Sequence, residues 1–530
     1  MAQRAFSTSI SSMKSFNDTV TATCYDTCPD AEAERRRNLA SAARVCKAFH
    51  EPALRVLWRQ LESLLPFFSL IGPPFAMVQK EAETYCLRPA RDVYHLPDHV
   101  SAQGWARLRK YAAYVRILYL WRWPVHMPYV LTPESWTSME VLFGDQPIFP
   151  NLRNLLWGAG HPEAELLGIL RFLPPTVDKL FLSCYTSPRP DEELGPVWRA
   201  LLPRVVEDIC KRVTRLSHFS VYLGDIDGSE LLTVLSLSHP PTLRGLNLRT
   251  QYGAPPITFS SFMGLARIID LENLILCVEC DSDSAASLPS LLGLPRLRHL
   301  RIPCYSELSS PAYGVITAAR LQSLNVHSMP YSSIAYLQRT CATWACSFPN
   351  LEVLNFELSP STPQDGVPTR SLLTAARALL DLRNIRTFVL HAQGCPLTVE
   401  DVDLTAMSEA WPSLTELCLG TMSTPDYSSG STAGASGLLS LAINCPRLTT
   451  LKFNQIVLRT EDDSVWPEEP LNHPLKKLEV TRGIAPNVCH LHDKLFPCLN
   501  LQGEPAEDGL YYVLVRQTVI NTRIRALTPS

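Results

Sequence analysis

Two groups of cysteine and histidine residues have the side chains that could hold a metal ion. Cys277 and Cys280 form a C-x-x-C pair in LILCVECD. A looser group near the end of the sequence consists of Cys489, His490, His492 and Cys498. Zinc sites need four ligands at suitable spacing, and neither group has a convincing second pair. We therefore expect no metal site and no cofactor.

The motifs that carry common catalytic chemistry are missing from the sequence. It contains no G-x-x-x-x-G-K-[ST], no G-x-S-x-G, no H-E-x-x-H and no G-x-G-x-x-G after a strand. The Gly/Ser run at 428–437 lacks the lysine of a phosphate-binding loop and is expected to be a loop between repeats. We expect a protein that is not an enzyme.

Composition and charge narrow the class of partner. The 530 residues are 46% apolar, and 48 Lys and Arg face 51 Asp and Glu, for a net charge of −3. This charge gives no general reason to bind nucleic acid or an anionic membrane. Prolines and Glu62 interrupt the longest apolar stretch, LESLLPFFSLIGPPFAMV, so we expect no transmembrane segment. Many of the 16 cysteines lie in apolar runs, which fits a reducing compartment, cytoplasmic and/or nuclear.

A six-residue frame, apolar-x-x-apolar-x-apolar, returns along the chain. Clear copies are PTLRGLNL, PRLRHLRI, PNLEVLNF, PSLTELCL and PRLTTLKF. Counted from the first apolar residue, the frames begin at 115, 152, 177, 216, 243, 271, 297, 321, 351, 385, 414, 448 and 475. Helically spaced segments such as SELLTVLSLS and RSLLTAARALLDL lie between them. Each unit therefore predicts one strand and one helix, and stacking of the units predicts a parallel sheet.

The repeated frame resembles leucine-rich repeats in an irregular form without a strict asparagine. The resemblance implies an α/β solenoid over 114–480, with a curved parallel sheet and helices outside. Leu246, Leu300, Leu354 and Leu417 should then be buried in equivalent places. An ordinary α/β domain with unrelated leucine-rich strands is the alternative.

A pair of helices is predicted ahead of the repeats. In RRRNLASAARVCKAFHE the apolar residues share one helical face, so a helix should end near Glu51 and Pro52 should begin a second one. Large aromatic side chains contribute most where elements meet, so we expect Phe49 and Trp58 to pack near Leu118 and Leu120.

The letters of this helix pair, NLASAARVCKAFHEPALRVLWRQLESLLP, resemble the second half of an F-box in fungal (basidiomycete-type) F-box proteins with degenerate leucine-rich repeats. In that family the F-box docks on the Skp-type adaptor of a cullin-RING ubiquitin ligase and the repeats hold the substrate. The resemblance implies adaptor contacts through residues 38–65, with these side chains: Leu39, Val45, Cys46, Phe49, Leu54, Leu57 and Trp58.

The sequence also departs from that family. An F-box opens with a leucine-proline-x-glutamate helix, and residues 1–34 contain nothing like it. Three interpretations stay open: a truncated gene start, a variant that has lost the first helix, or a helix pair kept as an N-terminal cap, which a solenoid needs. We expect a disordered tail at 1–34, the partial F-box at 35–70, a helical linker or cap at 71–113 and a C-terminal cap at 481–530.

The solvent face of the repeat sheet is the expected substrate site. Residues that flank the second and third apolar positions of a frame point away from the core. Those we expect to meet an unidentified protein substrate are His218, Tyr222, Asn247, Arg249, His299, Arg301, Asn325, His327, Asn355 and Glu357. Two functions remain: the substrate receptor of an SCF-type ubiquitin ligase, or a repeat scaffold that has lost adaptor binding.

Overall fold

The computed structural model describes the parts of the chain that carry the repeats and the helices before them. The described residues are 29–71, 77–81, 91–94, 100–120, 129–131, 137–139, 141, 143–144, 146–158, 168, 170, 173–183, 194–224, 226–250, 254–277, 292–303, 316–331, 333–360, 370–392, 395, 397–420, 432–456, 466–484 and 494–499.

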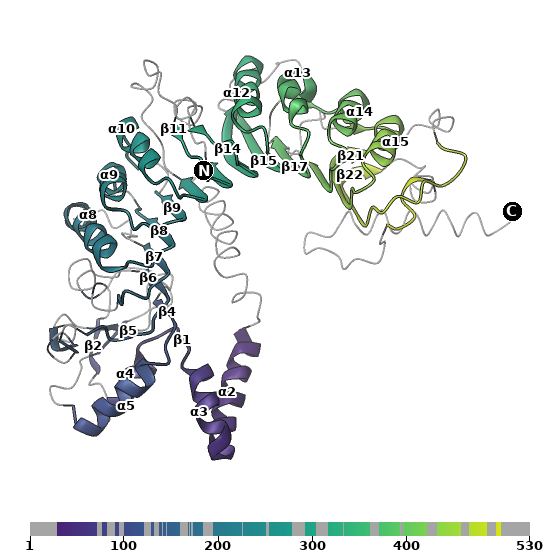
Figure 1. Ribbon diagram of the computed structural model, residues 1–530. Coiled ribbons are helices and arrows are strands. Elements are labelled where there is room, and N and C mark those ends of the chain that lie inside the picture. The colour runs from purple at the N-terminus through teal and green to yellow at the C-terminus, as the bar shows by residue number, and fades with distance from the viewer. Residues whose placement is uncertain are drawn as a thin grey trace. The chain divides into compact units, whose positions relative to one another are not determined.

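A fifteen-stranded, open parallel sheet contains all thirteen predicted strands. Its order is β1-β4-β6-β7-β8-β9-β10-β12-β14-β15-β17-β19-β21-β20, and β22 also pairs with β21 (Figure 1). The predicted strands are β4 (Ile117–Leu120), β6 (Asn154–Gly158), β7 (Lys179–Ser183), β8 (His218–Tyr222), β9 (Gly245–Arg249), β10 (Asn273–Cys277), β12 (His299–Pro303), β14 (Ser323–Tyr331), β15 (Val353–Pro360), β17 (Thr387–Ala392), β19 (Glu416–Gly420), β21 (Thr450–Ile456) and β22 (Lys477–Ile484). Each begins two residues after the first apolar residue of its frame. The sequence did not predict β1 (Gln60–Leu61) or β20 (Thr432–Ala433). The latter lies where a loop was expected, at 428–437.

Burial explains why the frame recurs. The second apolar residue of each frame stacks on its equivalent in the next strand: Leu246 pairs with Leu274 and Leu274 with Leu300. Further along, Leu354 pairs with Phe388 and Phe388 with Leu417. The four leucines singled out from the sequence, Leu246, Leu300, Leu354 and Leu417, are at most 2% exposed, which confirms their predicted burial in equivalent places.

The proline ahead of many frames forms a turn rather than merely ending a helix. The Leu351 amide donates to the Phe348 carbonyl at 3.2 Å, and the Leu414 amide donates to the Trp411 carbonyl at 3.0 Å. Pro349 and Pro412 are the second residues of these four-residue turns, where the fixed φ of proline fits. The turn leads from the preceding helix directly into the next strand.

The chain divides into two compact units, unit 1 (Met1–Leu180) and unit 2 (Phe181–Ser530). In unit 2, helical segments lie along one side of the sheet (Figure 1). They are α8 (Leu194–Arg212), α9 (Ser229–Ser238), α10 (Phe259–Met263), η2 (Gly264–Arg267), α12 (Ile334–Ser347), α13 (Leu372–Ala376), η4 (Arg377–Asp381), α14 (Asp401–Ala410) and α15 (Ala435–Asn444). Two short parallel pairs, β11 (Leu292–Gly293) with β13 (Ile316–Thr317) and β16 (Arg370–Ser371) with β18 (Leu397–Thr398), accompany them.

Carboxylates of α14 join neighbouring helical segments of unit 2. Asp403 is 1% exposed and accepts hydrogen bonds from the Ser371 hydroxyl at 2.5 Å and the Leu373 amide at 3.2 Å, at the start of α13. Asp401 likewise accepts from the Gly434 amide at 2.6 Å, just before α15. Each carboxylate therefore satisfies the free amides of a helix start in an adjacent repeat.

Unit 1 departs from the predicted boundaries. Its helices include α2 (Pro29–Val45), α3 (Lys47–Leu57), α4 (Leu65–Phe68), η1 (Ser69–Ile71) and α5 (Ala102–Ala112). Because α2 begins at Pro29, the expected tail at 1–34 is helical at its end, and residues 1–28 lie outside the described residues. The expected helical linker at 71–113 also contains β2 (Met77–Glu81) and β3 (Arg91–Tyr94), which form a separate sheet with β5 (Tyr129–Leu131).

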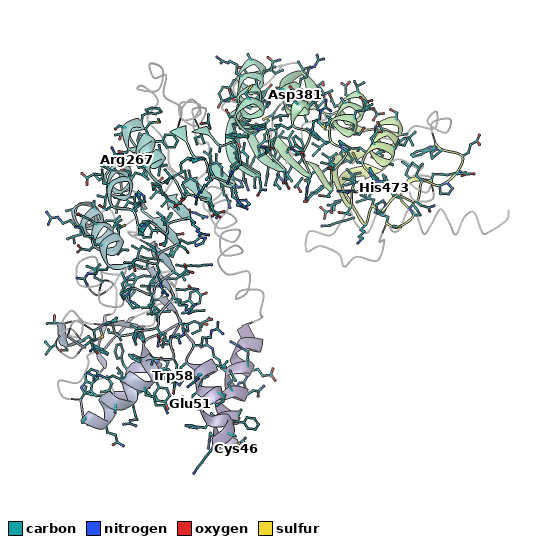
Figure 2. The ribbon with its side chains drawn as sticks, in the orientation of Figure 1. Cys46, Glu51, Trp58, Arg267, Asp381 and His473 are labelled. Atoms are coloured by element: carbon teal, nitrogen blue, oxygen red, sulfur yellow. The ribbon has the colours of Figure 1, made fainter. Side chains whose placement is uncertain are left out.

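Only residues 494–499 of the expected C-terminal cap beyond β22 are described, and they pack on the last repeats. The Phe496 ring meets the buried His473 ring edge-on, with centroids 5.3 Å apart. His473 Nε2 donates to the Cys445 carbonyl at 2.8 Å, and its Nδ1 accepts from the Leu475 amide at 3.2 Å. Burial lowers the pKa of His473. Protonation would also cost the hydrogen bond that Nδ1 accepts from the Leu475 amide. Figure 2 labels His473 beside the last strands.

We expect Leu354→Ala to lower the free energy of unfolding by about 2–5 kcal/mol, because stacked strands collapse poorly around a lost side chain. Ile443→Ala is the matched control, since Ile443 is 59% exposed on α15. It should change that free energy by less than about 0.5 kcal/mol. Urea unfolding followed by circular dichroism measures both, and equal effects would contradict the repeat packing.

Acidification should destabilise the fold through His473. Because its folded pKa is lowered, the unfolded chain binds the proton first as the pH falls below the ordinary value of 6.5. Stability is therefore full above that pH and decreases toward the folded pKa. His473→Gln should reduce this dependence in urea unfolding between neutral and mildly acidic pH. An unchanged slope would show that this ring does not contribute.

Candidate functional site

The helices ahead of the repeats form an antiparallel pair whose turn is not where the sequence predicts it (Figure 1). The first helix ends at Val45 rather than near Glu51, and Cys46 is the extended residue that precedes α3. Pro52 consequently lies inside α3. There it removes the amide that would bond the carbonyl of Ala48, whose residue is exposed and accessible to water.

Two local interactions fix the turn at Cys46. The Cys46 carbonyl accepts from the amides of Phe49 and His50, at 3.2 and 3.1 Å, and so begins α3. His50 Nδ1 then donates to the Ala43 carbonyl at 2.9 Å and satisfies an acceptor at the end of α2. Apolar spacing carries no information about such a side-chain cap, which is why the predicted boundary was wrong.

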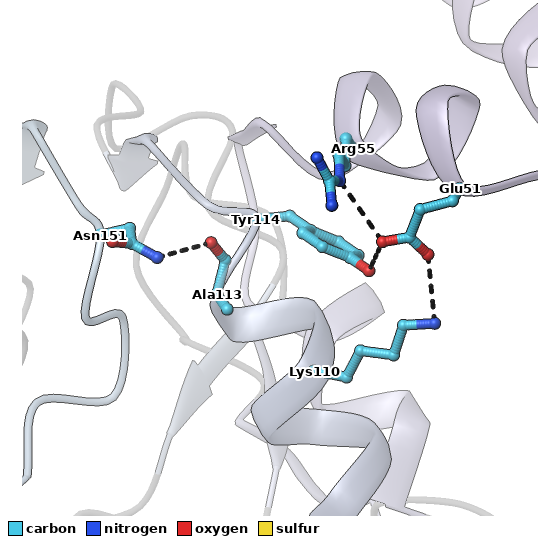
Figure 3. Close-up of polar contacts among 6 residues, drawn as sticks. All are labelled: Glu51, Arg55, Lys110, Ala113, Tyr114 and Asn151. Carbon is cyan, nitrogen blue, oxygen red and sulfur yellow. Dashed lines mark hydrogen bonds and ion pairs between the residues drawn. The ribbon is translucent and has the colours of Figure 1, made fainter.

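A polar cluster joins α3 to α5 (Figure 3). Glu51 accepts a short hydrogen bond from the Tyr114 hydroxyl, and it forms ion pairs with Lys110 at 3.2 Å and Arg55 at 3.4 Å. The Asn151 amide donates to the carbonyl of Ala113 at 2.9 Å, which ties the end of α5 to the turn before β6. We call Glu51, Arg55, Lys110 and Tyr114 the α3 anchor. The sequence pattern does not reveal it because its members are distant in the sequence.

The anchor favours ionised Glu51. The Tyr114 hydroxyl, and then Lys110 and Arg55, lower the pKa of the Glu51 carboxyl, against an opposing effect of burial. Burial, and then the same hydrogen bond, raise the pKa of Tyr114, and Glu51 raises that of Lys110. The anchor is therefore intact at neutral pH and weakens as acid protonates Glu51.

The predicted adaptor residues do not share one surface. Leu54 is buried in a small core with Ala43 and Ala53, and Leu57 and Trp58 pack against that core. Leu39 is half-buried on α2, while Val45, Cys46 and Phe49 are exposed. Cys46 lies at the end of the helix pair away from β1 (Figure 2). Leu54 is therefore a core residue that cannot meet an adaptor directly.

Large apolar side chains remain exposed around the turn and along α3. Val45 is 72% exposed, Phe49 58% and Val56 45%. Phe49, Pro52 and Val56 follow helical spacing, so they lie on one side of α3. We call Val45, Phe49, Pro52 and Val56 the apolar side of the helix pair.

The expected packing of Phe49 and Trp58 against the first strand is wrong for Phe49. Trp58 packs on α5, where its ring lies 4.8 Å from that of Tyr111. Phe49 is more than half exposed, and it points well away from the buried Leu54, which is five residues further along α3. Leu118 is fully buried without it.

In unit 2 the predicted substrate residues lie on the sheet face opposite the helical segments. Residues at the first, third and fifth positions of each strand alternate with the buried leucines. Arg301 pairs with Asn325, and Asn325 pairs with Asn355, which makes one polar row across β12, β14 and β15. His218 and Tyr222 lie at the two ends of β8, and His299 begins β12.

Some of the predicted substrate residues are buried and others are accessible to solvent. Asn247 and Arg249 are 4% and 6% exposed, and Arg249 Nε donates to Asn247 Oδ1 at 3.1 Å. Tyr222 is also buried. His299 is exposed, and burial lowers its pKa despite that exposure. The accessible part of the predicted face therefore consists of His218 on β8 and the predicted residues of strands β12 to β15.

A second row on this face joins His327, Glu357 and His391 on β14, β15 and β17. His327 Nδ1 lies 3.7 Å from Glu357 Oε2, and Glu357 pairs with His391 across the strands. Gly420 leaves room for His391, because a side-chain carbon there would lie 2.8 Å from Nδ1 of that ring. Burial lowers the pKa of His391.

The predicted substrate face did not include His391 or the Lys452–Glu479 ion pair of 2.9 Å, although they share that face. The signal was present, because Lys452 and Glu479 lie between the second and third apolar positions of PRLTTLKF and PLKKLEV, and His391 directly follows the third apolar position of NIRTFVL. Counting those positions through every frame would have identified all three.

The cysteine and histidine groups considered for metal binding lie largely outside the described residues. Across the described ranges, no cluster of three or more histidine, cysteine or acidic residues could hold a metal ion. In the same ranges, no helix is both long and apolar enough to cross a membrane.

Comparisons with known proteins give a structural likeness but no match in sequence. No family model and no curated protein matches the chain. A chain in the crystal structure of the Rad7 and Elc1 complex in yeast is 13% identical, with a TM-score of 0.32, over 65% of this chain and 80% of that chain. A likeness of this size carries no functional inference.

Removing the α3 anchor should loosen α3 locally. We expect Glu51→Ala, or Tyr114→Phe, to speed amide exchange in residues 47–57 and leave unit 2 unchanged, because the helix loses its polar link to α5. The double variant should add little to Glu51→Ala alone, since that change already removes the contact with Tyr114. Glu207→Ala, which removes an exposed ion pair on α8, is the control for hydrogen exchange by mass spectrometry. Exchange that is unchanged in 47–57 would contradict this role.

Proposed function

We propose that this chain is the substrate-recognition subunit of an SCF-type (cullin-RING) ubiquitin ligase. The helix pair docks on a Skp-type adaptor, and through it on a cullin, while the sheet face of the repeats holds a protein substrate. The observation that carries the proposal is the apolar side of the helix pair, on a helix that the α3 anchor fixes to its own unit.

The chemistry of that side favours a protein partner. Single exposed apolar residues are common, but here Val45, Phe49 and Val56 gather with Pro52 on one short element. An exposed aromatic ring flanked by aliphatic side chains is the usual anchor of a protein interface. The letters V-C-K-A-F and P-A-L-R-V-L-W, which motivate the F-box resemblance, supply these residues.

The substrate half of the proposal rests on the polar rows of unit 2. Asn325 and Asn355 offer amide donors and acceptors, and His327 with Glu357 adds ionisable groups, all on a face with half-buried side chains. In the described part of the chain, Asn325 Oδ1 and His327 Nε2 are enclosed yet lack a hydrogen-bond partner. Buried polar atoms without partners favour a polar ligand that would satisfy them.

One observation favours the alternative, a non-catalytic leucine-rich-repeat scaffold without adaptor binding. The Arg59 carbonyl, just after α3, accepts from the Arg116 and Ile117 amides at 2.8 and 3.0 Å, as equivalent carbonyls do between repeats. The segment after α3 thus forms the first layer of the sheet, and α3 serves as a cap whether or not an adaptor binds.

Binding of a purified Skp-type adaptor separates the two functions. We expect Phe49→Asp with Val56→Asp to weaken it at least about tenfold, since the charges replace apolar anchors. Val402→Asp with Ile443→Asp is the matched control, because those side chains are 71% and 59% exposed on α14 and α15. Isothermal titration calorimetry measures affinity, and circular dichroism verifies folding. If the unaltered chain binds no adaptor, only the scaffold function remains.

A further inference from the structure

Three arginines occupy successive layers of the sheet in unit 1. The Arg59 carbonyl accepts from the Arg116 amide at 2.8 Å, and the Arg116 carbonyl accepts from the Arg153 and Asn154 amides at 2.8 and 3.0 Å. Neighbouring strands lie about 4.8 Å apart, so the three backbones are stacked at that spacing. We call Arg59, Arg116 and Arg153 the arginine strip.

Within the described residues, the arginines of the strip form no ion pair. The Arg116 guanidinium donates to the Asn151 carbonyl at 3.1 Å, and no carboxylate in the described ranges forms an ion pair with any of the three. Burial, and then the charges of Arg153 and Arg59, lower the pKa of Arg116. Asp178 occupies the next layer after Arg153 and limits the strip on that side.

The same row of unit 2 is arranged differently. There Arg244 pairs with Glu272 at 3.7 Å, and Arg386 pairs with Glu352 at 3.4 Å. Like charges directly opposite each other on neighbouring strands destabilise a sheet, and opposite charges stabilise it. Neighbouring carboxylates compensate these two arginines of unit 2, whereas the strip keeps three positive charges in successive layers without an ion pair.

We propose that the arginine strip binds an acidic peptide segment of a protein partner. Guanidinium groups bind carboxylates in bidentate geometry, and an extended peptide presents alternate side chains to one face at about 6.6 Å. Two carboxylates would span the strip, whose ends are about 10 Å apart. The net charge of −3 and the acidic layer at Asp178 disfavour a long polyanion such as nucleic acid. This binding is separate from adaptor docking and does not require it.

Fluorescence anisotropy on the full chain tests the strip, with a labelled peptide of alternating Glu and Ser as the probe. The variant Arg59→Gln/Arg116→Gln/Arg153→Gln should lose affinity about tenfold or more, and binding should weaken with salt. The control Arg107→Gln/Arg109→Gln/Arg212→Gln removes equal charge at exposed positions on α5 and α8 and should stay within about twofold. Equal losses in both variants, or no binding to the intact chain, would overturn the proposal.

Two further measurements distinguish an acidic peptide from a different anion and from a purely structural role of the strip. A peptide with phosphoserine in place of Glu, or a single-stranded oligonucleotide, would displace the acidic-peptide assignment if it bound more tightly through the same three arginines. Thermal unfolding at low salt tests the structural role. The triple variant should be at least as stable as the unaltered chain, because it relieves repulsion. A lower Tm would instead show that the arginines stabilise the fold, and it would overturn the proposal. If the triple variant does not fold, a lower Tm of Arg116→Gln alone would have the same meaning.

Discussion

Between most neighbouring strands of the described sheet, one backbone carbonyl accepts hydrogen bonds from two successive amides of the next repeat. The Arg244 carbonyl receives those of Glu272 and Asn273 at 2.7 and 2.9 Å, and the Glu352 carbonyl those of Arg386 and Thr387 at 2.7 and 3.1 Å. This contact fixes where each strand starts relative to its neighbour. Since side chains alternate between faces, a one-residue slip would bury the polar rows and expose the leucines. The polar rows and the arginine strip both depend on this register.

The strand positions could be predicted because the frame is a direct consequence of that register. A residue that each strand buries beneath the sheet must be apolar. Leu274, Leu324 and Leu451 are buried at the position that Leu246 occupies in its own strand. Spacing alone therefore located every predicted strand. The same logic placed the polar rows on one face, since their positions follow from alternation.

What could not be predicted depends on contacts between distant residues or on hydrogen-bonded caps. The turn at Cys46 is fixed by His50, which only the folded backbone brings to the Ala43 carbonyl. The α3 anchor joins Glu51 to Lys110 and Tyr114, and no local pattern marks a carboxylate for such a role. Burial of Asn247 and Arg249 on the face opposite the helices is likewise a tertiary property. The frame predicts which way a side chain points, but not whether other residues cover it.

The register also explains how one scaffold can present unlike surfaces without changing its core. The row that forms ion pairs in unit 2 and the arginine strip in unit 1 is set by the same doubled hydrogen bond, in which the side chain takes no part. The side chains of this row are therefore free to vary. In unit 2 Arg244 lies beside Glu272, whereas in unit 1 Arg116 lies beside Arg153, and the backbone contact is the same in both. Apolar frame positions have no such freedom. Binding specificity in this architecture accordingly lies in the residues that the frame leaves unspecified.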